Sequence, residues 1–196
     1  FGLSGSGKST LTHSKHNGKY KVKVLHDDAF IIDLLDGSSI ALEPAYFDKT
    51  QDYPADHPEQ EYFLTAQNVG VTKDVDGKRV LVTEDIRNGN GRTVKSRYVT
   101  PDRVDKFHSA IEGIYWIMKD DSLPPLVKIE NPILAATFGA TLATKRSTAE
   151  TARKGEDRDR LVIEPYANPF RVYPLIEDYE DFKALLSKEA VDCYII

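Results

Sequence analysis

The chain has 196 residues, of which 40% are hydrophobic and 29% charged, so it can build a sizeable core and is not globally disordered. Its 31 acidic and 26 basic residues give a net charge of −5, which excludes a broad basic surface for nucleic acid but not a local phosphate site. No apolar run approaches the roughly 20 residues that span a membrane. The first residues do not form a signal peptide, and the single cysteine, Cys193, leaves no disulfide framework. We therefore expect a cytoplasmic protein without membrane or nucleic-acid partners.

The first half of the chain predicts one short helix followed by strands and tight turns. Residues 8–13 follow a glycine-rich loop without a breaker, which predicts a helix, and the alternation in residues 20–25 (YKVKVL) predicts a strand. Asp36-Gly37 and the segment 74–77 (DVDG) are turn signals, so a hairpin is expected around each. The predicted hairpin strands are residues 30–35 with 39–42, and 69–72 with 79–83.

The second half predicts further strands and two helices. Strands are expected over residues 92–99, 114–118 (IYWIM) and 191–196 (VDCYII). Helices are expected from residue 133 to about residue 145, beginning at Asn131-Pro132, and over residues 179–188. The charge-rich stretch 147–160 predicts a solvated loop. Together these elements predict an α/β fold, a mixed β-sheet mononucleotide-binding domain that covers residues 1–196 as one domain.

A phosphate-binding loop is the strongest motif of the sequence. The pattern G-x-x-x-x-G-K-[ST] is matched at every fixed position by Gly2-Leu3-Ser4-Gly5-Ser6-Gly7-Lys8-Ser9. The glycines let successive N–H groups point into one anion hole, Lys8 is suited to the β- and γ-phosphates, and the Ser9 hydroxyl is suited to Mg²⁺. The alternative is a chance glycine-rich turn, which the extra Gly5 and the following Thr10 disfavour. The motif predicts nucleoside triphosphate binding.

The loop alone does not identify the reaction, because GLSGSGKST also resembles the loop of small kinases such as adenylylsulfate kinase. Downstream, Asp27 and Asp28 follow the strand predicted over residues 20–25. Carboxylates at a strand end near a triphosphate hold the divalent metal or its waters. The alternative is an ordinary acidic turn.

With these motifs the sequence resembles the ATP-dependent phosphoenolpyruvate carboxykinases. That family has a GLSGTGKTT-type loop, an Asp-Asp pair, a Glu-Gly-Gly-Cys-Tyr-Ala-Lys-Thr stretch, an Asn-Thr-Arg segment, a Pro-Pro-Val segment and a glycine- and threonine-bearing run. The corresponding segments here, in the same order, are residues 2–10, 27–28, 43–50 (EPAYFDKT), 90–92 (NGR), 124–127 (PPLV) and 138–141 (FGAT). The resemblance covers almost the whole chain, and apart from the loop it depends on the order of the motifs.

The resemblance implies a role for several residues. Lys8 and Ser9 would hold the phosphates of ATP and Mg²⁺, Asp28 would ligate a second metal, usually Mn²⁺, and Asp27 would lie on the water shell of the nucleotide metal. Lys49 would lie near the nucleotide phosphates. Arg92 would stabilise the transferring phosphoryl group, with Arg97 as the competing candidate because the family's arginine also shortly precedes a tyrosine. An arginine suits this task because its charge spreads over two phosphate oxygens.

The implied reaction converts oxaloacetate and ATP to phosphoenolpyruvate, ADP and CO₂. Pro44-Ala45 departs from the family's Gly-Gly, and the segments that complete the second metal site, grip oxaloacetate and contact adenine in the family lie outside this sequence. We therefore expect a domain cut at both ends, with little turnover by itself. The alternatives are a carboxykinase-like kinase with another small-molecule or protein acceptor, and a nucleotide-binding module without catalysis.

The remaining candidates are expected to be structural. His26, His57 and His108 lack the paired spacing of a metal site, and Asp120-Asp121 is expected to be a solvated turn. Tyr115 and Trp116 lie in an apolar segment and are expected in the core. Cys193 is expected to be a small buried hydrophobe.

Overall fold

The structure is a computed structural model that describes residues 1–3, 6–13, 19–43, 46–49, 70–81, 92–95, 102–118, 120–145 and 161–196. It divides into two compact units. The first unit consists of Phe1–Lys8, Ile32–Ser39 and Phe107–Ile196, and the second of Ser9–Ile31 and Ile40–Lys106. The described residues form helices and small sheets, so the predicted α/β class is confirmed. No helix in these described ranges is long and apolar enough to cross a membrane.

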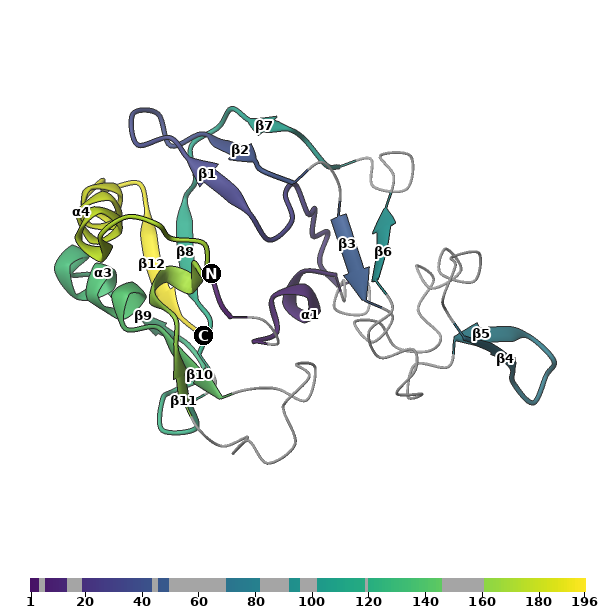
Figure 1. Cartoon of the computed structure of the whole chain (residues 1–196). Helices are drawn as coiled ribbons and strands as arrows, with labels where there is room; N and C mark the ends of the chain where they lie inside the picture. Colours follow the sequence, from purple (N-terminus) through teal and green to yellow (C-terminus); the bar gives the residue numbers. More distant parts are fainter. Residues whose placement is uncertain are drawn as a thin grey trace. The chain divides into compact units, whose positions relative to one another are not determined.

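A mixed sheet organises the first unit. Strand β12 (Asp192–Ile195) lies between β8 (Gly113–Trp116) and β9 (Val127–Lys128), parallel to β8 and antiparallel to β9 (Figure 1). The strands predicted over residues 114–118 and 191–196 are therefore confirmed, with slightly shorter bounds. Phe1 pairs with the free edge of β8. Its N–H₃⁺ donates to the Tyr115 backbone carbonyl at 2.7 Å, and its own carbonyl accepts from the Ile117 N–H at 2.8 Å. This is the bonding pattern of a parallel pair.

Two helices cover one face of this sheet (Figure 1). Helix α3 (Pro132–Ala140) begins at Asn131, whose side chain accepts from the N–H groups of Ile133 and Leu134. Helix α4 (Leu175–Leu186) follows Pro174, and two acidic residues in its first turn favour this start. The helix predicted over residues 179–188 is therefore confirmed up to residue 186, and it starts and ends earlier than expected. The 3₁₀ turn η3 (Pro165–Ala167) contacts α3.

The predicted extension of the first of these helices to residue 145 is wrong. After Ala140 the chain leaves the helix and forms β10 (Ala143–Lys145), which pairs antiparallel with β11 (Leu161–Ile163). Thr144 is buried in this ladder, opposite Val162. A β-branched residue has a weak helix preference and packs well in a strand, so the tertiary pairing decides the conformation here. The strand β11 was not predicted, and the charge-rich loop predicted over residues 147–160 lies outside the described residues.

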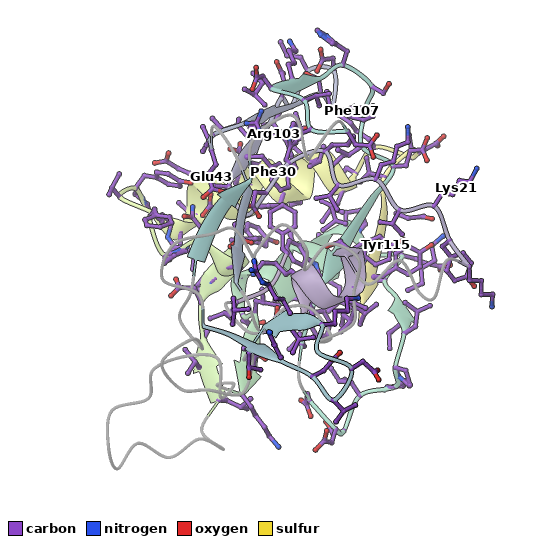
Figure 2. The ribbon with its side chains drawn as sticks, turned by 90° about the vertical axis from the view of Figure 1, so that its right-hand side faces the viewer. Lys21, Phe30, Glu43, Arg103, Phe107 and Tyr115 are labelled. Carbon is purple, nitrogen blue, oxygen red and sulfur yellow. The ribbon has the colours of Figure 1, made fainter. Side chains whose placement is uncertain are left out.

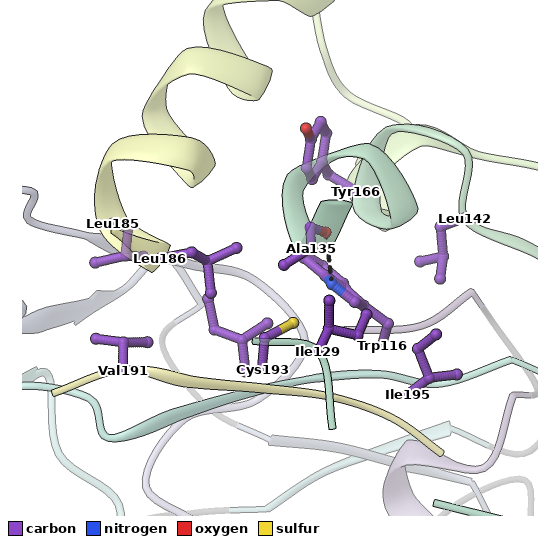
Figure 3. Packing of buried hydrophobic residues seen from close by; sticks show 11 residues of the cluster. Trp116, Ile129, Ala135, Leu142, Tyr166, Leu185, Leu186, Val191, Cys193 and Ile195 are labelled. Carbon is purple, nitrogen blue, oxygen red and sulfur yellow. Dashed lines mark hydrogen bonds between the residues drawn. The ribbon is translucent and has the colours of Figure 1, made fainter. Parts of the chain in front are cut away.

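The core of the first unit is formed by side chains that alternate along the strands and meet the helices. Trp116 is fully buried and donates its indole N–H to the Ala135 carbonyl at 3.1 Å (Figure 3). Tyr166 packs edge-on against Trp116 and stacks on Phe182 with ring centroids 4.4 Å apart. The Tyr166 hydroxyl donates to the Ala136 carbonyl at 2.8 Å. The rest of the buried cluster consists of Ile114, Ile129, Ala135, Leu142, Leu185, Leu186, Val191, Cys193 and Ile195.

A three-stranded sheet contains the first predicted hairpin. Its strands are β1 (Phe30–Ile32), β2 (Ser39–Ala41) and β7 (Lys106–Phe107), in the order β1-β2-β7. The Asp36 carboxylate accepts from the Ser38 N–H at 2.8 Å, and the Gly37 N–H donates to the Asp33 carbonyl at 2.8 Å. The hairpin is therefore confirmed and its turn lies at the predicted Asp36-Gly37. The short strand β7 was not predicted.

The remaining strands of the second unit form two-stranded ladders. The predicted second hairpin is confirmed within the described residues, with β4 (Val71–Lys73) antiparallel to β5 (Arg79–Leu81). Strand β6 (Arg92–Lys95) confirms the described part of the strand expected over residues 92–99 and pairs antiparallel with β3 (Tyr46–Lys49), which was not expected. The short helix α1 (Lys8–His13) is also confirmed.

The strand predicted over residues 20–25 is wrong. This segment joins no ladder of the described residues, although the Leu25 carbonyl accepts from the Val104 N–H at 3.1 Å. Alternation of apolar and polar residues favours an extended backbone, but a strand also needs a neighbouring strand in register. That second requirement is not readable from the segment itself.

Candidate functional site

The glycine-rich loop begins where Phe1 leaves the edge of the mixed sheet. The Phe1 ring lies 5.3 Å from the ring of Trp116 and 5.4 Å from that of Phe182, centroid to centroid. These contacts and the two hydrogen bonds to the β8 segment fix the position from which the loop starts. Residues 1–8 belong to the first unit, so the loop is anchored to its core.

Two glycines of the loop have a clear steric reason. A Cβ on Gly2 would lie 2.4 Å from the Ser6 Oγ and 3.0 Å from the Ile117 Cβ, so a side chain there would force both neighbours to shift. Gly7 has a φ of +108°, a conformation that residues with a side chain rarely adopt. The Ser6 N–H donates to the Leu3 carbonyl at 3.0 Å and closes the turn between them. The backbone therefore needs glycine at both positions.

Lys8 is folded back onto the loop. Its Nζ donates to the Gly2 carbonyl at 2.8 Å and to the Leu3 carbonyl at 3.2 Å. The ammonium thus lies beside the backbone of residues 2–3, where its charge is partly compensated by carbonyl dipoles. Ser4 and Gly5 lie outside the described residues, as do the side chains of Ser9 and Thr10.

The predicted acidic pair belongs to the second unit. Asp27 is half-buried and Asp28 is exposed. The neighbouring His26 has its Nδ1 3.1 Å from the Val104 carbonyl and its ring centroid 5.8 Å from that of Phe30, as expected for a structural histidine. Within the described ranges, no three His, Cys, Asp or Glu side chains are grouped so that they could hold a metal. Carboxylate oxygens suit Mg²⁺ and Mn²⁺ by their chemistry, so the pair supplies two ligands of the right type.

Lys49 and Arg92 are brought together although they are distant in the sequence. In the ladder of β3 with β6, Lys49 is the direct cross-strand partner of Arg92. Their side chains are not among the described ones, and Arg97 lies outside the described residues altogether. The register shows that two predicted site residues lie directly opposite each other in the ladder. Neither sequence motif predicted this pairing by itself.

A buried arginine was missed by the sequence analysis. Arg103 donates to the Asp105 carboxylate at 2.7 Å and also to the Glu43 carbonyl, and its side chain is only 2% exposed (Figure 2). The Glu43 carboxylate in turn accepts from the Ala29 N–H at 3.3 Å. Glu43 opens the carboxykinase-like segment 43–50, so this contact fixes the start of that segment. The alternating charges of Asp102, Arg103 and Asp105 were the available signal.

Two of the residues expected in the core are buried and one is not. Trp116 and Cys193 are 0% and 2% exposed, and burial raises the pKa of the Cys193 thiol to about 11. The expectation for Tyr115 is wrong, because it is 45% exposed and stacks on Tyr194 with centroids 5.0 Å apart. Adjacent residues of a strand face opposite sides, so Tyr115 cannot share the face of Trp116.

The segment after β8 forms the expected turn. The Asp120 carboxylate accepts from the backbone N–H of Ser122 at 3.0 Å and from its hydroxyl at 2.7 Å. These two hydrogen bonds lower the pKa of Asp120 below its usual value. Both bonds are local, so they explain Asp120 as a turn residue.

A hollow of about 300 Å³ lies in the first unit, between β9, β12 and the adjoining ends of α3 and α4. Three of its charged side chains have partners. Lys128 pairs with Asp192 at 2.7 Å, and Lys188 donates to the Leu34 carbonyl. None of the predicted site residues lines this hollow.

The comparisons with known proteins add no relative. No protein-family model matches the chain. The search of curated proteins finds no significant match either. The functional hypothesis therefore depends on the loop and on the order of the sequence motifs.

Proposed function

We propose that the chain binds a nucleoside triphosphate at residues 2–9 and belongs to an ATP-dependent phosphoryl-transfer enzyme. The observation that carries the proposal is the loop itself. Its sequence fits the phosphate-loop pattern at every fixed position, its described glycines are sterically required, and Lys8 lies against the loop backbone. In this proposal Lys8 turns from these carbonyls to a phosphate held by the loop N–H groups.

The reaction proposed is that of the ATP-dependent phosphoenolpyruvate carboxykinases, which convert oxaloacetate and ATP to phosphoenolpyruvate, ADP and CO₂. The support is the resemblance in motif order, including Asp27-Asp28 and the segment of Lys49. In this proposal the fold is carboxykinase-like, a mononucleotide-binding domain with the loop at the end of a strand.

Each side chain has a stated task in this proposal. Lys8 and Arg92 bind the transferring phosphoryl group and spread its charge, with Lys49 beside the nucleotide phosphates. Mg²⁺ would be held by Ser9 with Asp27 on its water shell, and Mn²⁺ by Asp28. These cations supply further positive charge for phosphoryl transfer. The cross-strand pairing of Lys49 with Arg92 supports a common task for the two residues.

The test is isothermal titration of the chain with ATP and Mg²⁺, with and without Mn²⁺. The expected result is binding by the wild-type chain, loss of at least tenfold in affinity for Lys8→Ala, and loss of the Mn²⁺ effect for Asp28→Asn. Lys128→Ala is the matched control, since this lysine pairs with Asp192 on another element of the first unit. A folded wild-type chain that does not bind ATP would contradict the proposal.

A second candidate is a carboxykinase-like kinase that acts on another small molecule or on a protein. It is favoured by Pro44-Ala45, which replaces the glycine pair of the family and indicates a diverged acceptor site. A third candidate, a nucleotide-binding module without catalysis, would bind ATP and not consume it. Incubation with ATP and oxaloacetate, followed by assays for phosphoenolpyruvate and ADP, distinguishes the three.

A further inference from the structure

The segment 170–176, on the connection from η3 to α4 (Figure 1), exposes several large apolar side chains. Phe170 and Val172 are 82% and 95% exposed, and Leu175 and Ile176 are exposed as well. None of these four residues belongs to the buried cluster of the first unit or to the partly buried residues packed against it. Single exposed apolar residues are ordinary, whereas several in one short segment are typical of an interaction surface.

A polar network fixes the conformation of this segment from its inner side. Arg171, between the two most exposed residues, donates to the Pro165 carbonyl at 3.4 Å and lies 3.5 Å from the Asp178 carboxylate. The Tyr173 hydroxyl donates to the same carboxylate at 2.7 Å. The side chains of Arg171 and Asp178 are largely buried. The network therefore anchors the polar side chains of the segment and leaves the apolar ones on the outside.

The turn before the segment has an unfavourable backbone conformation that the core maintains. Tyr166 and Ala167 have φ angles of 54° and 52°, in the left-handed region that residues with a side chain rarely adopt. The Tyr166 hydroxyl bond to Ala136 and the stack of its ring on Phe182 hold this turn in place. Maintained strain of this kind is typical of binding sites. A segment fixed in this way loses little conformational entropy when a partner binds.

The surroundings of the segment are acidic. Residues 161–181 contain five acidic residues and one basic residue, Arg171, whose charge is compensated by Asp178. Glu177 and Asp181 are exposed on α4, and their carboxylates have no ion pair within the part of the chain that the structure describes. Their i, i+4 spacing places them on one face of α4, directly after the apolar segment.

We propose that the segment 170–176, with Glu177 and Asp181, is a docking surface for a basic amphipathic segment of a partner protein. Apolar side chains of the partner cover Phe170 and Val172, and its lysine or arginine residues pair with the two carboxylates. A second copy of this chain is disfavoured, because a two-fold contact through the surface brings the carboxylates of both copies to one interface. The surface uses no residue of the proposed nucleotide site, so it does not depend on the proposed function.

The probes are two labelled helical peptides with the same leucine face at i, i+3, i+4 and i+7 spacing. One peptide has lysine and the other glutamate at every remaining position. Fluorescence anisotropy with the wild-type chain should show binding of the lysine peptide and at least about tenfold weaker binding of the glutamate peptide. Equal affinities, or no binding of the lysine peptide, would overturn the proposal. Because the whole chain carries a net charge of −5, variants must locate the contact.

The first variant replaces the apolar contact. Phe170→Ser combined with Val172→Ser should weaken binding of the lysine peptide by about tenfold or more, because the apolar area covered in the complex is lost. Leu35→Ser combined with Val75→Ser is the matched control, since these two residues are as exposed and lie in the hairpin turns. The control should bind as the wild type does. Equal affinities of the two double variants would overturn the proposal.

The second variant reverses the charge of the surface. Glu177→Lys combined with Asp181→Lys should abolish the preference for the lysine peptide and favour the glutamate peptide. Asp76→Lys combined with Glu112→Lys changes the net charge by the same amount at exposed carboxylates on other elements, and should keep the preference for the lysine peptide. The same loss of preference in both double variants would show a general charge effect and overturn the proposal.

The oligomeric state tests the competing occupant. Sedimentation of the wild-type chain should show no association through this surface. A dimer that Phe170→Ser with Val172→Ser dissociates, and that Leu35→Ser with Val75→Ser does not, would show that a second copy occupies the surface. That result would overturn the proposal of a basic partner.

Discussion

The described parts of the two units are held together by different kinds of interaction. In the first unit, an aromatic and aliphatic cluster around Trp116 and Tyr166 fills the space between a mixed sheet and two helices. In the second unit, none of the described residues is a buried hydrophobic, and the ordered features are short ladders, tight turns and the buried Arg103. Burial of large apolar side chains contributes more free energy than single turns and hydrogen bonds. Substitutions should therefore have large effects in the first unit and small, local effects in the described parts of the second.

The largest expected effect is that of Trp116→Ala. The change removes a fully buried ring together with the hydrogen bond from its indole N–H to Ala135, and should lower the free energy of unfolding by about 3–5 kcal/mol. Tyr115→Ala, one residue earlier on the exposed face, is the control and should cost about 1 kcal/mol or less. Denaturant unfolding measures both losses of free energy when it is followed by circular dichroism, a signal that does not depend on the substituted tryptophan. Equal losses would show that the alternation of β8 does not determine the core.

Gly139→Ala tests how closely this core is packed. An added Cβ would lie 2.5 Å from the Tyr166 Cε1 and 2.8 Å from the Trp116 Cζ2, so the rings would have to move. The expected destabilisation is about 1–3 kcal/mol, despite the better helix propensity of alanine. Gly113→Ala in β8 is the matched control, because its nearest contact is an ordinary 3.4 Å to the Tyr115 Cε2. A stabilised Gly139→Ala variant would contradict the observed packing.

Asp74→Ala tests the second unit. The Asp74 carboxylate accepts from the N–H groups of Asp76 and Lys78 at 3.0 and 2.9 Å, and these bonds close the turn between β4 and β5. Their loss should lower the free energy of opening the hairpin by about 1 kcal/mol. The amides of residues 71–81 should then exchange hydrogen about fivefold faster. The exchange of β8 and β12 should stay unchanged. Faster exchange in both units would contradict the expectation of a local effect.

Near pH 8 the smallest effect is expected from the titration of Cys193. Burial raises its pKa to about 11, so the folded chain holds a neutral thiol at a pH where the unfolded chain releases the proton. Its contribution to stability is complete below the unfolded pKa of about 8.5 and is lost as the pH rises toward about 11. The measurement is the unfolding midpoint at pH 8, 9 and 10, with Cys193→Ala as the control that lacks this slope. The thiol should also resist iodoacetamide at pH 8 in the folded chain and react on unfolding.

Several features were determined by the sequence alone, because they depend on neighbours along the chain. The turns at Asp36-Gly37 and Asp74-Gly77 were predictable, since glycine and aspartate favour turns by local geometry and hydrogen bonds. The N-terminus of α3 at Asn131-Pro132 follows from capping, and β12 follows from its apolar run. The most specific motif of the candidate site was also readable from the sequence, because residues 2–9 are consecutive in the chain.

Other features were decided by the tertiary structure, because they depend on residues that are distant in the sequence. Residues 143–145 continue a helical pattern, yet they pair with β11, while residues 20–25 alternate like a strand and join no ladder of the described residues. The pairing of Lys49 with Arg92 and the burial of Arg103 beneath Glu43 likewise need the folded chain. The Ser6 hydroxyl is a further feature that the sequence does not predict, although it lies inside the phosphate-loop motif. The sequence identifies a serine in a phosphate loop, and only packing against Gly2 leaves that hydroxyl buried and unpaired, because hydrogen-bond satisfaction is a property of positions in space.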